Sequence, residues 1–279
     1  MYTVTRRDLD GVRYDIHRCP ACELLYAAGP VTPDLMAAVY SKSFYASGQQ
    51  AAPRRADGRL AANAETWPVI ANGRARSKWL YDLGLRGRLL DVGAGCGYFV
   101  YCASSQFAAT GIEAQLAATL DAQRLGVALV HGDAMTHDFG STQFDVITLW
   151  DVFAGFPEPR AALDRFMSLL APGKHLVMTL PDASSLAARV LRQRWPLMIP
   201  PGNLCFYTPR AIAHLLDRPD VAGFEISRHP KRVSVRFLMH KLVRSIGLHR
   251  LAYVQWPVPA AWSISLNLHD ILTLVVTKR

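Results

Sequence analysis

The sequence lacks any uninterrupted apolar run close to the roughly 18 residues that a membrane-spanning helix needs. Its first ten residues, MYTVTRRDLD, also lack the apolar core of a secretion signal. Its cysteines are five in number and scattered, which is not typical of a disulfide framework. These absences predict a soluble cytoplasmic protein with reduced thiols. A chain of 279 residues can form one α/β domain with additions, stable without disulfides or metals.

Acidic residues are scarce in one part of this basic chain, whose net charge is +9. Residues 226–269 contain no Asp or Glu and seven Lys or Arg residues. Within them, the spacing over 233–246 predicts a helix with an apolar stripe and basic flanks. This helix would either cover a pocket and attract an anionic acceptor, a carrier-bound intermediate or a membrane surface, or simply lie on the surface with solvated charges. A basic face alone gives only non-specific attraction to nucleic acid, so we do not expect a nucleic-acid partner. The stripe is Val235, Leu238, Met239, Leu242 and Ile246, and the flanking residues are Arg232, Arg236, Lys241 and Arg244.

Glycine is concentrated where it matters most, in the stretch RLLDVGAGCGYF over residues 88–99. The apolar residues around Asp91 predict a strand buried on both faces. Gly93, Gly95 and Gly97 follow at alternate positions and indicate a tight turn into a helix. Without side chains there, a ligand can approach main-chain N–H groups at the helix N-terminus.

A carboxylate follows this turn at an informative distance. The run ATGIE over 109–113 predicts a second strand, and its last residue, Glu113, comes 20 residues after Gly93. At the tip of the neighbouring strand, this carboxylate would accept two ribose hydroxyls. The spacing therefore favours a nucleoside-containing ligand over an ordinary strand-to-helix connection.

The glycine spacing also distinguishes between nucleoside cofactors. Dinucleotide sites prefer Gly-x-Gly-x-x-Gly, and here the last glycine position is Tyr98. The stretch resembles motif I of class I S-adenosylmethionine-dependent methyltransferases, and the resemblance extends from about Trp79 to the C-terminus. It implies an α/β fold with a doubly wound, Rossmann-like, seven-stranded and mostly parallel sheet. Helices would cover both faces, with N-terminal and C-terminal helical additions over the site. The implied cofactor is S-adenosylmethionine, with S-adenosylhomocysteine as product and no metal.

The resemblance assigns further cofactor contacts. The turn after the third strand would bind the adenine ring, with Asp133 accepting the exocyclic amine, the Ala134 N–H meeting a ring nitrogen and Met135 packing on the ring. Trp150 lies at the end of the fourth strand, where such sheets bind ligands. An aromatic pair, Phe44 and Tyr45, would cover the cofactor or form a small separate core.

The same comparison leaves the catalytic residues open. Related sequences continue after the fourth strand with an acidic residue and a histidine, but this chain has Ala154 and Gly155. Asn203 stands where a second histidine is frequent. Asp151 and Tyr207 are the candidate bases, and either would otherwise orient substrate or pack. We therefore expect a methyltransferase for a small-molecule acceptor, acting on O, N or C. The alternative is a non-catalytic or cofactor-binding partner subunit with the same fold.

A Cys-x-x-Cys turn near the N-terminus could supply two ligands to a zinc ion. Cys19 and Cys22 form this turn, and His17 offers a third donor. The turn resembles the CPxCG segment with which many bacterial methyltransferases of this type begin, often after a second cysteine pair. Here that second pair is missing, and Glu23 stands in place of the glycine. We expect a turn without metal.

The chain divides into an N-terminal segment, residues 1–74, and a cofactor-binding domain, residues 75–279, with an acceptor-site insertion at about 183–250. A polar connection over 48–59 could be a lid. The patterns predict helices over 32–45, 75–85, 115–124, 157–170, 183–194, 208–216 and 233–246, and strands over 89–92, 109–113, 128–130, 144–149, 175–180, 223–227 and 271–277.

Overall fold

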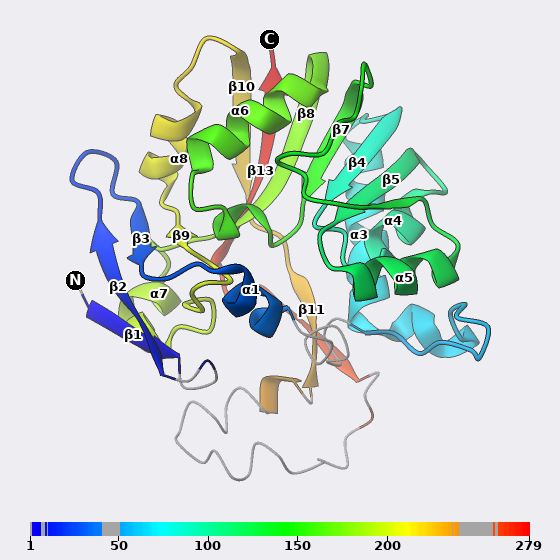
Figure 1. Cartoon of the computed structure of the whole chain (residues 1–279), viewed down its shortest axis with the longest axis horizontal. Helices are drawn as coiled ribbons and strands as arrows, with labels where there is room; N and C mark the ends of the chain where they lie inside the picture. Colours follow the sequence, from blue (N-terminus) through cyan, green and yellow to red (C-terminus); the bar gives the residue numbers. More distant parts are fainter. Residues whose placement is uncertain are drawn as a thin grey trace.

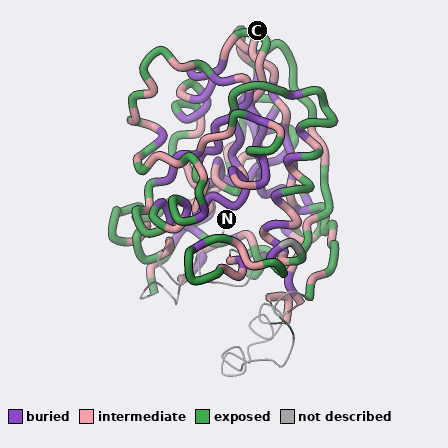
Figure 2. The backbone as a smooth tube through the Cα atoms, turned by 90° about the vertical axis from the view of Figure 1, so that its right-hand side faces the viewer, coloured by how far each residue is buried: buried purple, intermediate pink, exposed green. Residues whose placement is uncertain are grey.

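A computed structural model describes residues 2–6, 9, 11–40, 51–235, 237–239, 259 and 262–279. A large sheet with helices on both faces occupies the upper part of Figure 1, and a smaller sheet built from the N-terminus lies beside it. Figure 2 shows buried residues running through the middle of the molecule.

The large sheet has seven strands in the order β10-β13-β8-β7-β4-β5-β6. Only β13 runs antiparallel to its neighbours, so the sheet is mostly parallel. This confirms the predicted doubly wound, Rossmann-like architecture. The strands are β4 (Arg88–Val92), β5 (Ala108–Glu113), β6 (Leu129–His131), β7 (Phe144–Leu149), β8 (Leu170–Pro181), β10 (Val221–Ser227) and β13 (Ile271–Lys278).

Alternation along the strands creates two cores. Leu89 of β4 packs with the helices α3 (Pro68–Asp82) and α4 (Tyr98–Ala103), whereas Leu90 faces the helices α6 (Pro159–Leu169) and α8 (Pro209–Leu216). Successive side chains of a strand point to opposite faces, so strands covered on both sides need continuous apolar runs. The helix α5 (Leu116–Leu125) packs in a further cluster with α3 and α4.

A second, antiparallel sheet joins the N-terminus to the predicted acceptor insertion. Its order is β1-β2-β3-β9, with β1 (Tyr2–Arg6), β2 (Val12–Arg18), β3 (Leu25–Ala28) and β9 (Cys205–Phe206). Phe206 and Trp195 are buried against Val4 and Ile16 in a core of their own. The predicted domain boundary at residue 74 stays a prediction. β1, β2 and β3 precede this boundary in the sequence, and they share a sheet with β9, which follows it.

The helix α1 (Pro33–Val39) begins as predicted, because the Thr32 hydroxyl accepts the Leu35 N–H and Pro33 occupies the first turn. The predicted aromatic cover at Phe44 and Tyr45 lies outside the described residues, and so do residues 48–50 of the predicted lid. Residues 51–59 are irregular, and Arg54 ties them to α4 and α5 by donating to the Tyr98 hydroxyl at 3.2 Å and to the Asp121 carbonyl at 2.6 Å. Their role as a lid stays a prediction. A short 3-10 helix, η2 (Ala62–Thr66), then leads into α3, which begins at Pro68, before the predicted start.

The acceptor insertion differs from the prediction in two places. The helix expected over 183–194 is split into α7 (Leu186–Leu191) and the 3-10 helix η4 (Arg192–Arg194), because Arg192 adopts a φ of 47°. The helix expected over 233–246 does not begin at Val233. Val233 and Ser234 belong to β11 (Lys231–Ser234), which pairs with β12 (Ser263–Leu266) and so satisfies its backbone hydrogen bonds in a ladder. Residues 235 and 237–239 are helical. Five of the nine predicted stripe and flanking residues lie outside the described residues: Arg236, Lys241, Leu242, Arg244 and Ile246.

Candidate functional site

The order of strands marks one position in the sheet. From β4, the chain proceeds outward through β5 and β6 in one direction and through β7 and β8 in the other. The connections that leave β4 and β7 therefore diverge at their carboxyl ends, which is where such sheets bind ligands, and we call this end of the sheet the crevice. The glycine turn follows β4, Glu113 is the last residue of β5, and Trp150 and Asp151 follow β7.

The glycine turn has a backbone that other residues rarely adopt. Gly93, Gly95 and Gly97 have φ values of 69°, 55° and 75°. A Cβ at Gly93 would also lie 2.6 Å from the Val152 Cγ2, too close for any side chain without movement. The turn thus brings bare main chain to the crevice, and Gly97 starts α4 as its N-cap.

Glu113, at the end of the neighbouring strand β5, binds the backbone of this turn. Its Oε2 accepts the Gly95 N–H at 2.8 Å, and its Oε1 accepts the Gln115 N–H at 2.8 Å. The residue is only 6% exposed. These two bonds fix the carboxylate between the segments that follow β4 and β5. Each carboxylate oxygen can accept more than one hydrogen bond. The geometry suits an acceptor for paired hydroxyls.

Asp91 is a second buried carboxyl group, one residue before the end of β4. It is 3% exposed and accepts the Thr148 hydroxyl at 2.7 Å. Burial raises its pKa to about 7, with a further increase from Glu113, although the Thr148 bond and the Arg76 charge act in the opposite direction. Its charge therefore changes near neutral pH.

The predicted adenine turn forms a compact loop after β6. The Asp133 carboxylate accepts the Met135 N–H at 2.9 Å, and the Asp133 carbonyl accepts two further backbone N–H groups. Ala134 is buried, and its carbonyl accepts the Arg165 guanidinium at 3.1 Å. Asp133 itself is exposed beside the tips of β5 and β6.

Trp150 lies where β7 ends, on the α3 and α4 side of the sheet. The Phe99 and Trp150 rings form an edge-to-face pair with their centroids 5.3 Å apart. The Arg76 guanidinium lies over the Trp150 ring, 4.4 Å from its centroid. Its indole N–H is buried without a hydrogen-bond partner among the described residues. A buried donor in this state is unusual in folded proteins and is consistent with a ligand contact.

Asp151 is held by cations rather than left available for proton transfer. Its Oδ2 lies 2.7 Å from the Lys231 Nζ and 3.4 Å from the Arg76 Nη2, while its Oδ1 accepts the Thr179 hydroxyl at 3.1 Å. Desolvation raises the pKa of this carboxyl, but Lys231 and Arg76 outweigh it and hold the pKa well below its ordinary value. A carboxylate with so low a pKa is a weak base, and its catalytic role stays a prediction.

Tyr207, the other predicted catalytic residue, lies inside the protein. It is 1% exposed and packs beside Phe153, and its hydroxyl has no hydrogen-bond partner in the described part of the chain. Burial, together with Cys205, raises its pKa well above the ordinary value. This geometry favours packing, and a catalytic role for Tyr207 stays a prediction.

One aromatic residue near the crevice was not predicted. Tyr40 ends α1, and its hydroxyl would lie 4.0 Å from a Cβ built on Gly155. Desolvation and the nearby Glu113 charge both raise the Tyr40 pKa. The same built Cβ would lie 3.0 Å from the Gly202 carbonyl, which explains why no larger residue stands at 155. A tyrosine at the end of an amphipathic helix gives no local signal of this role.

The comparisons with known proteins agree with this geometry. A family model described as a methyltransferase domain matches residues 64–229, more than half of the chain. The chain belongs to this methyltransferase family. No curated protein matches the sequence.

Solved structures share the methyltransferase fold at low identity. The YcgJ protein from Bacillus subtilis is 16% identical, with a TM-score of 0.52 over 74% of this chain and 99% of its own. A methyltransferase from Thermotoga maritima, described as a "possible histamine N-methyltransferase", is 15% identical, with a TM-score of 0.50 over 76% of this chain and 92% of its own. The plantazolicin methyltransferase BpumL, in complex with a substrate analogue and S-adenosylhomocysteine, is 16% identical, with a TM-score of 0.50 over 77% and 84%.

The Cys-x-x-Cys turn of this methyltransferase connects β2 to β3. Backbone N–H groups of Cys22 and Ala21 lower the Cys19 pKa, whereas burial raises the Cys22 pKa. Glu23 adopts a φ of 68°, the left-handed conformation that a glycine would provide. No group of three metal-binding side chains occurs among the residues that the structure describes.

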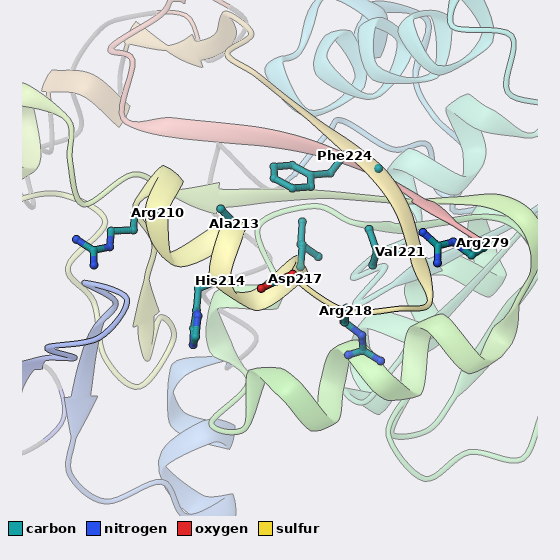
Figure 3. A pocket seen from close by; sticks show the side chains of 10 residues that line it. Arg210, Ala213, His214, Asp217, Arg218, Val221, Phe224 and Arg279 are labelled. Carbon is teal, nitrogen blue, oxygen red and sulfur yellow. The ribbon is translucent and has the colours of Figure 1, made fainter.

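A separate pocket lies between α8 and β10, at the amino ends of the parallel strands and therefore away from the crevice (Figure 3). Its cations are already partnered in part: Arg218 pairs with Asp164 and Asp220, and Arg210 with Glu23. We assign no role in methyl transfer to it.

Proposed function

We propose that the protein is an S-adenosylmethionine-dependent methyltransferase for a small-molecule acceptor, free or carrier-bound and anionic. The observation that carries the cofactor assignment is the bond between the Glu113 carboxylate and the Gly95 N–H, inside a turn of three glycines with positive φ at the strand-order reversal. The plantazolicin methyltransferase BpumL, a structural neighbour with S-adenosylhomocysteine bound, supports it.

The donors and acceptors of the crevice fit this cofactor. Glu113 would hold the ribose hydroxyls, and the turn from Asp133 to Met135 would bind the adenine, with Ala134 supplying an N–H. Asp91 offers a carboxylate to the cationic part of the cofactor, and the glycine turn leaves room for its main chain to approach. Trp150, at the end of β7, and Tyr40, near Gly155 and Glu113, would contact the cofactor or the acceptor.

The cofactor supplies an electrophilic methyl group, so the protein's contribution is mainly to hold an acceptor lone pair in line with it. Positioning alone can provide a large part of the acceleration of such a displacement. Asp151 is tied to Lys231 and Arg76, and Tyr207 is buried. We therefore infer an acceptor that loses its proton easily. The positive charges of Arg76, Lys231 and the predicted acceptor-site insertion at about 183–250 would attract an anionic acceptor.

The alternative, a partner subunit without catalysis, is favoured by one feature. The positions at which related sequences carry histidines are Gly155, packed against the Gly202 carbonyl, and Asn203, whose amide donates to the Leu197 carbonyl at 2.8 Å. Neither can act as a base.

Calorimetry with S-adenosylmethionine, S-adenosylhomocysteine and NAD tests the proposal. We expect both sulfur compounds to bind and NAD not to bind. NAD binding alone would contradict the cofactor assignment. Binding of the sulfur compounds without methyl transfer to any anionic acceptor in a radiolabel screen would favour the partner subunit.

A further inference from the structure

Two parts of the chain contain no acidic residue. Residues 183–216 follow Asp182, and residues 226–269 precede Asp270. Together they carry eleven Lys and Arg residues, while all 22 Asp and Glu residues lie elsewhere. Arg210, Arg228 and Lys231 pair with carboxylates of other parts of the chain. A surface that presents the remaining cations would suit an anionic partner.

These same two parts expose the most apolar surface. Among the described residues, the four most exposed large apolar side chains are Leu186 at 77%, Val190 at 67%, Trp262 at 61% and Leu268 at 60%. The next is Leu116, at 54%. All four lie in the acid-free segments, although nothing in the fold requires them to coincide with the basic residues.

The helix α7 combines both properties over one and a half turns. Leu186 and Val190 are four residues apart and so share one face, while Ala188 packs inward. Arg189, Arg192 and Arg194 are exposed around them. Arg189 and Arg194 form no ion pair with any carboxylate in the described part of the chain. The Arg192 guanidinium lies over the Tyr2 ring, 5.6 Å from its centroid. The helix and the turn after it therefore present two aliphatic side chains and three exposed arginines.

Two buried carboxyl groups hold the acid-free segments together. The Asp182 N–H donates to the Asp270 carbonyl at 2.8 Å, and the Asp270 carboxylate accepts the Trp195 indole N–H at 3.0 Å. Arg228 donates to the Asp182 carboxylate at 2.6 Å. These bonds place the start of α7 beside the segment that carries Leu268. In Figure 1, α7 and β11 both lie below the large sheet.

We propose that this face, formed by α7, η4 and residues 262–269, attaches the protein to the surface of a bilayer that contains anionic phospholipids. Leu186 and Val190 would enter the boundary between headgroups and acyl chains, and the arginines would meet lipid phosphates. Trp262 suits the same boundary. The helices that the structure describes include none that could span a bilayer.

A bilayer fits this face better than an acidic protein. The aliphatic side chains of Leu186 and Val190 are mostly exposed and lie in no pocket that the structure shows, whereas protein interfaces draw their energy from aromatic residues packed into pockets. Arginines follow them at the end of α7 and in η4, and helices that lie in the membrane interface combine apolar and basic residues in this way.

Flotation with vesicles tests the proposal on the full chain. We expect binding to vesicles of phosphatidylcholine mixed with phosphatidylglycerol, weakened by salt, and little binding to phosphatidylcholine alone. Leu186→Ser with Val190→Ser should reduce affinity about tenfold or more, because two apolar side chains leave the lipid. Replacing Arg189, Arg192 and Arg194 by Gln should reduce it on the order of a hundredfold.

Matched variants provide the controls. Leu116→Ser with Leu120→Ser has the same spacing on α5, where both side chains are also exposed. Replacing Arg13, Arg55 and Arg124 by Gln removes the same net charge from exposed positions elsewhere. Both controls should retain vesicle binding, and every variant should retain its calorimetric affinity for S-adenosylmethionine, which separates this proposal from the cofactor assignment.

Three results would overturn the proposal. The first is absence of binding to anionic vesicles, and the second is equal loss of binding in the α7 variants and their controls. The third is α7-dependent retention on immobilised polyglutamate with no retention on vesicles, which would identify an acidic protein as the partner.

Discussion

At the scale of single residues, Glu113 binds the glycine turn through the Gly95 N–H, and we propose that it also accepts the ribose hydroxyls. Glu113→Ala removes the charged acceptor for two hydroxyls, a loss of about 1.5 to 3 kcal/mol in cofactor binding. We expect the calorimetric Kd for S-adenosylmethionine to rise at least tenfold. Glu225→Ala, which removes an exposed carboxylate from the edge strand β10, is the control. An unchanged Kd in Glu113→Ala would remove Glu113 from the site.

Asp91 predicts a pH dependence of the same affinity. Its pKa is about 7 in the free protein, so it is mostly neutral at pH 6 and mostly charged at pH 8. A cationic ligand prefers the charged form, and S-adenosylmethionine affinity should therefore increase as pH rises through 7. Asp91→Asn, which cannot ionise, should bind more weakly and lose this pH dependence. Titrations at several pH values decide the matter, and parallel slopes in both proteins would contradict the assignment.

Asp91 should also make the stability of the folded protein depend on pH. Whereas cofactor affinity should increase with pH, this contribution to stability should decrease. The Asp91 pKa rises from an ordinary value of 3.8 to about 7 on folding, so the folded protein binds more protons between these values. Its contribution to stability is therefore present at low pH and decreases as pH rises from about 4 to 7. Thermal unfolding of Asp91→Asn should lack this component, and the gap between the two melting temperatures should change sign or narrow across that range.

At the scale of elements, Asp151 connects three parts of the fold. It follows β7, pairs with Arg76 of α3 and with Lys231 of β11, and adopts a φ of 63°. The Asn72 side chain adds two bonds to the Arg232 backbone, at 2.8 and 2.9 Å. The pair of strands β11 and β12 is thus attached to α3 beside the site.

Asp151→Asn tests whether this attachment or acid-base chemistry matters. Asn tolerates a positive φ, so the substitution removes charge without adding backbone strain. We expect a loss on the order of 1 kcal/mol, since the pairs are partly solvated, and a melting temperature lower by a few degrees. The pH profile of kcat should keep its shape. Loss of one limb of that profile would instead show that Asp151 transfers a proton.

The sequence predicted those elements whose signals are local. The apolar run before Gly93 and the ATGIE strand need only their own residues to be recognised, and both lie where they were expected. β11 was missed because its partner, β12, lies about thirty residues away and the intervening pattern favours a helix. β9 has only two residues and exists because it pairs with β3. Tyr40 reaches the crevice only through the packing of α1, which no local pattern encodes.

At the scale of the whole molecule, the small sheet raises the question of whether the chain unfolds as one unit. The family match begins at residue 64, yet β1, β2 and β3 precede it and pair with β9 from inside the match. Ile16 is 1% exposed and packs with Phe206 and Trp195. Since burial of these side chains depends on both segments, their stabilities should be coupled.

Ile16→Ala measures this coupling. Loss of a buried isoleucine costs about 2 to 5 kcal/mol, which corresponds to a fall of roughly 5 to 15 °C in melting temperature for a protein of this size. We expect a single calorimetric transition that shifts as a whole, and that S-adenosylmethionine raises in both proteins because it binds only the folded state. Val12→Ala, at a half-buried position of the same strand, should shift it less. Two transitions, with the one that responds to cofactor unmoved by Ile16→Ala, would show instead that the N-terminal sheet unfolds separately and that the crevice is stable without it.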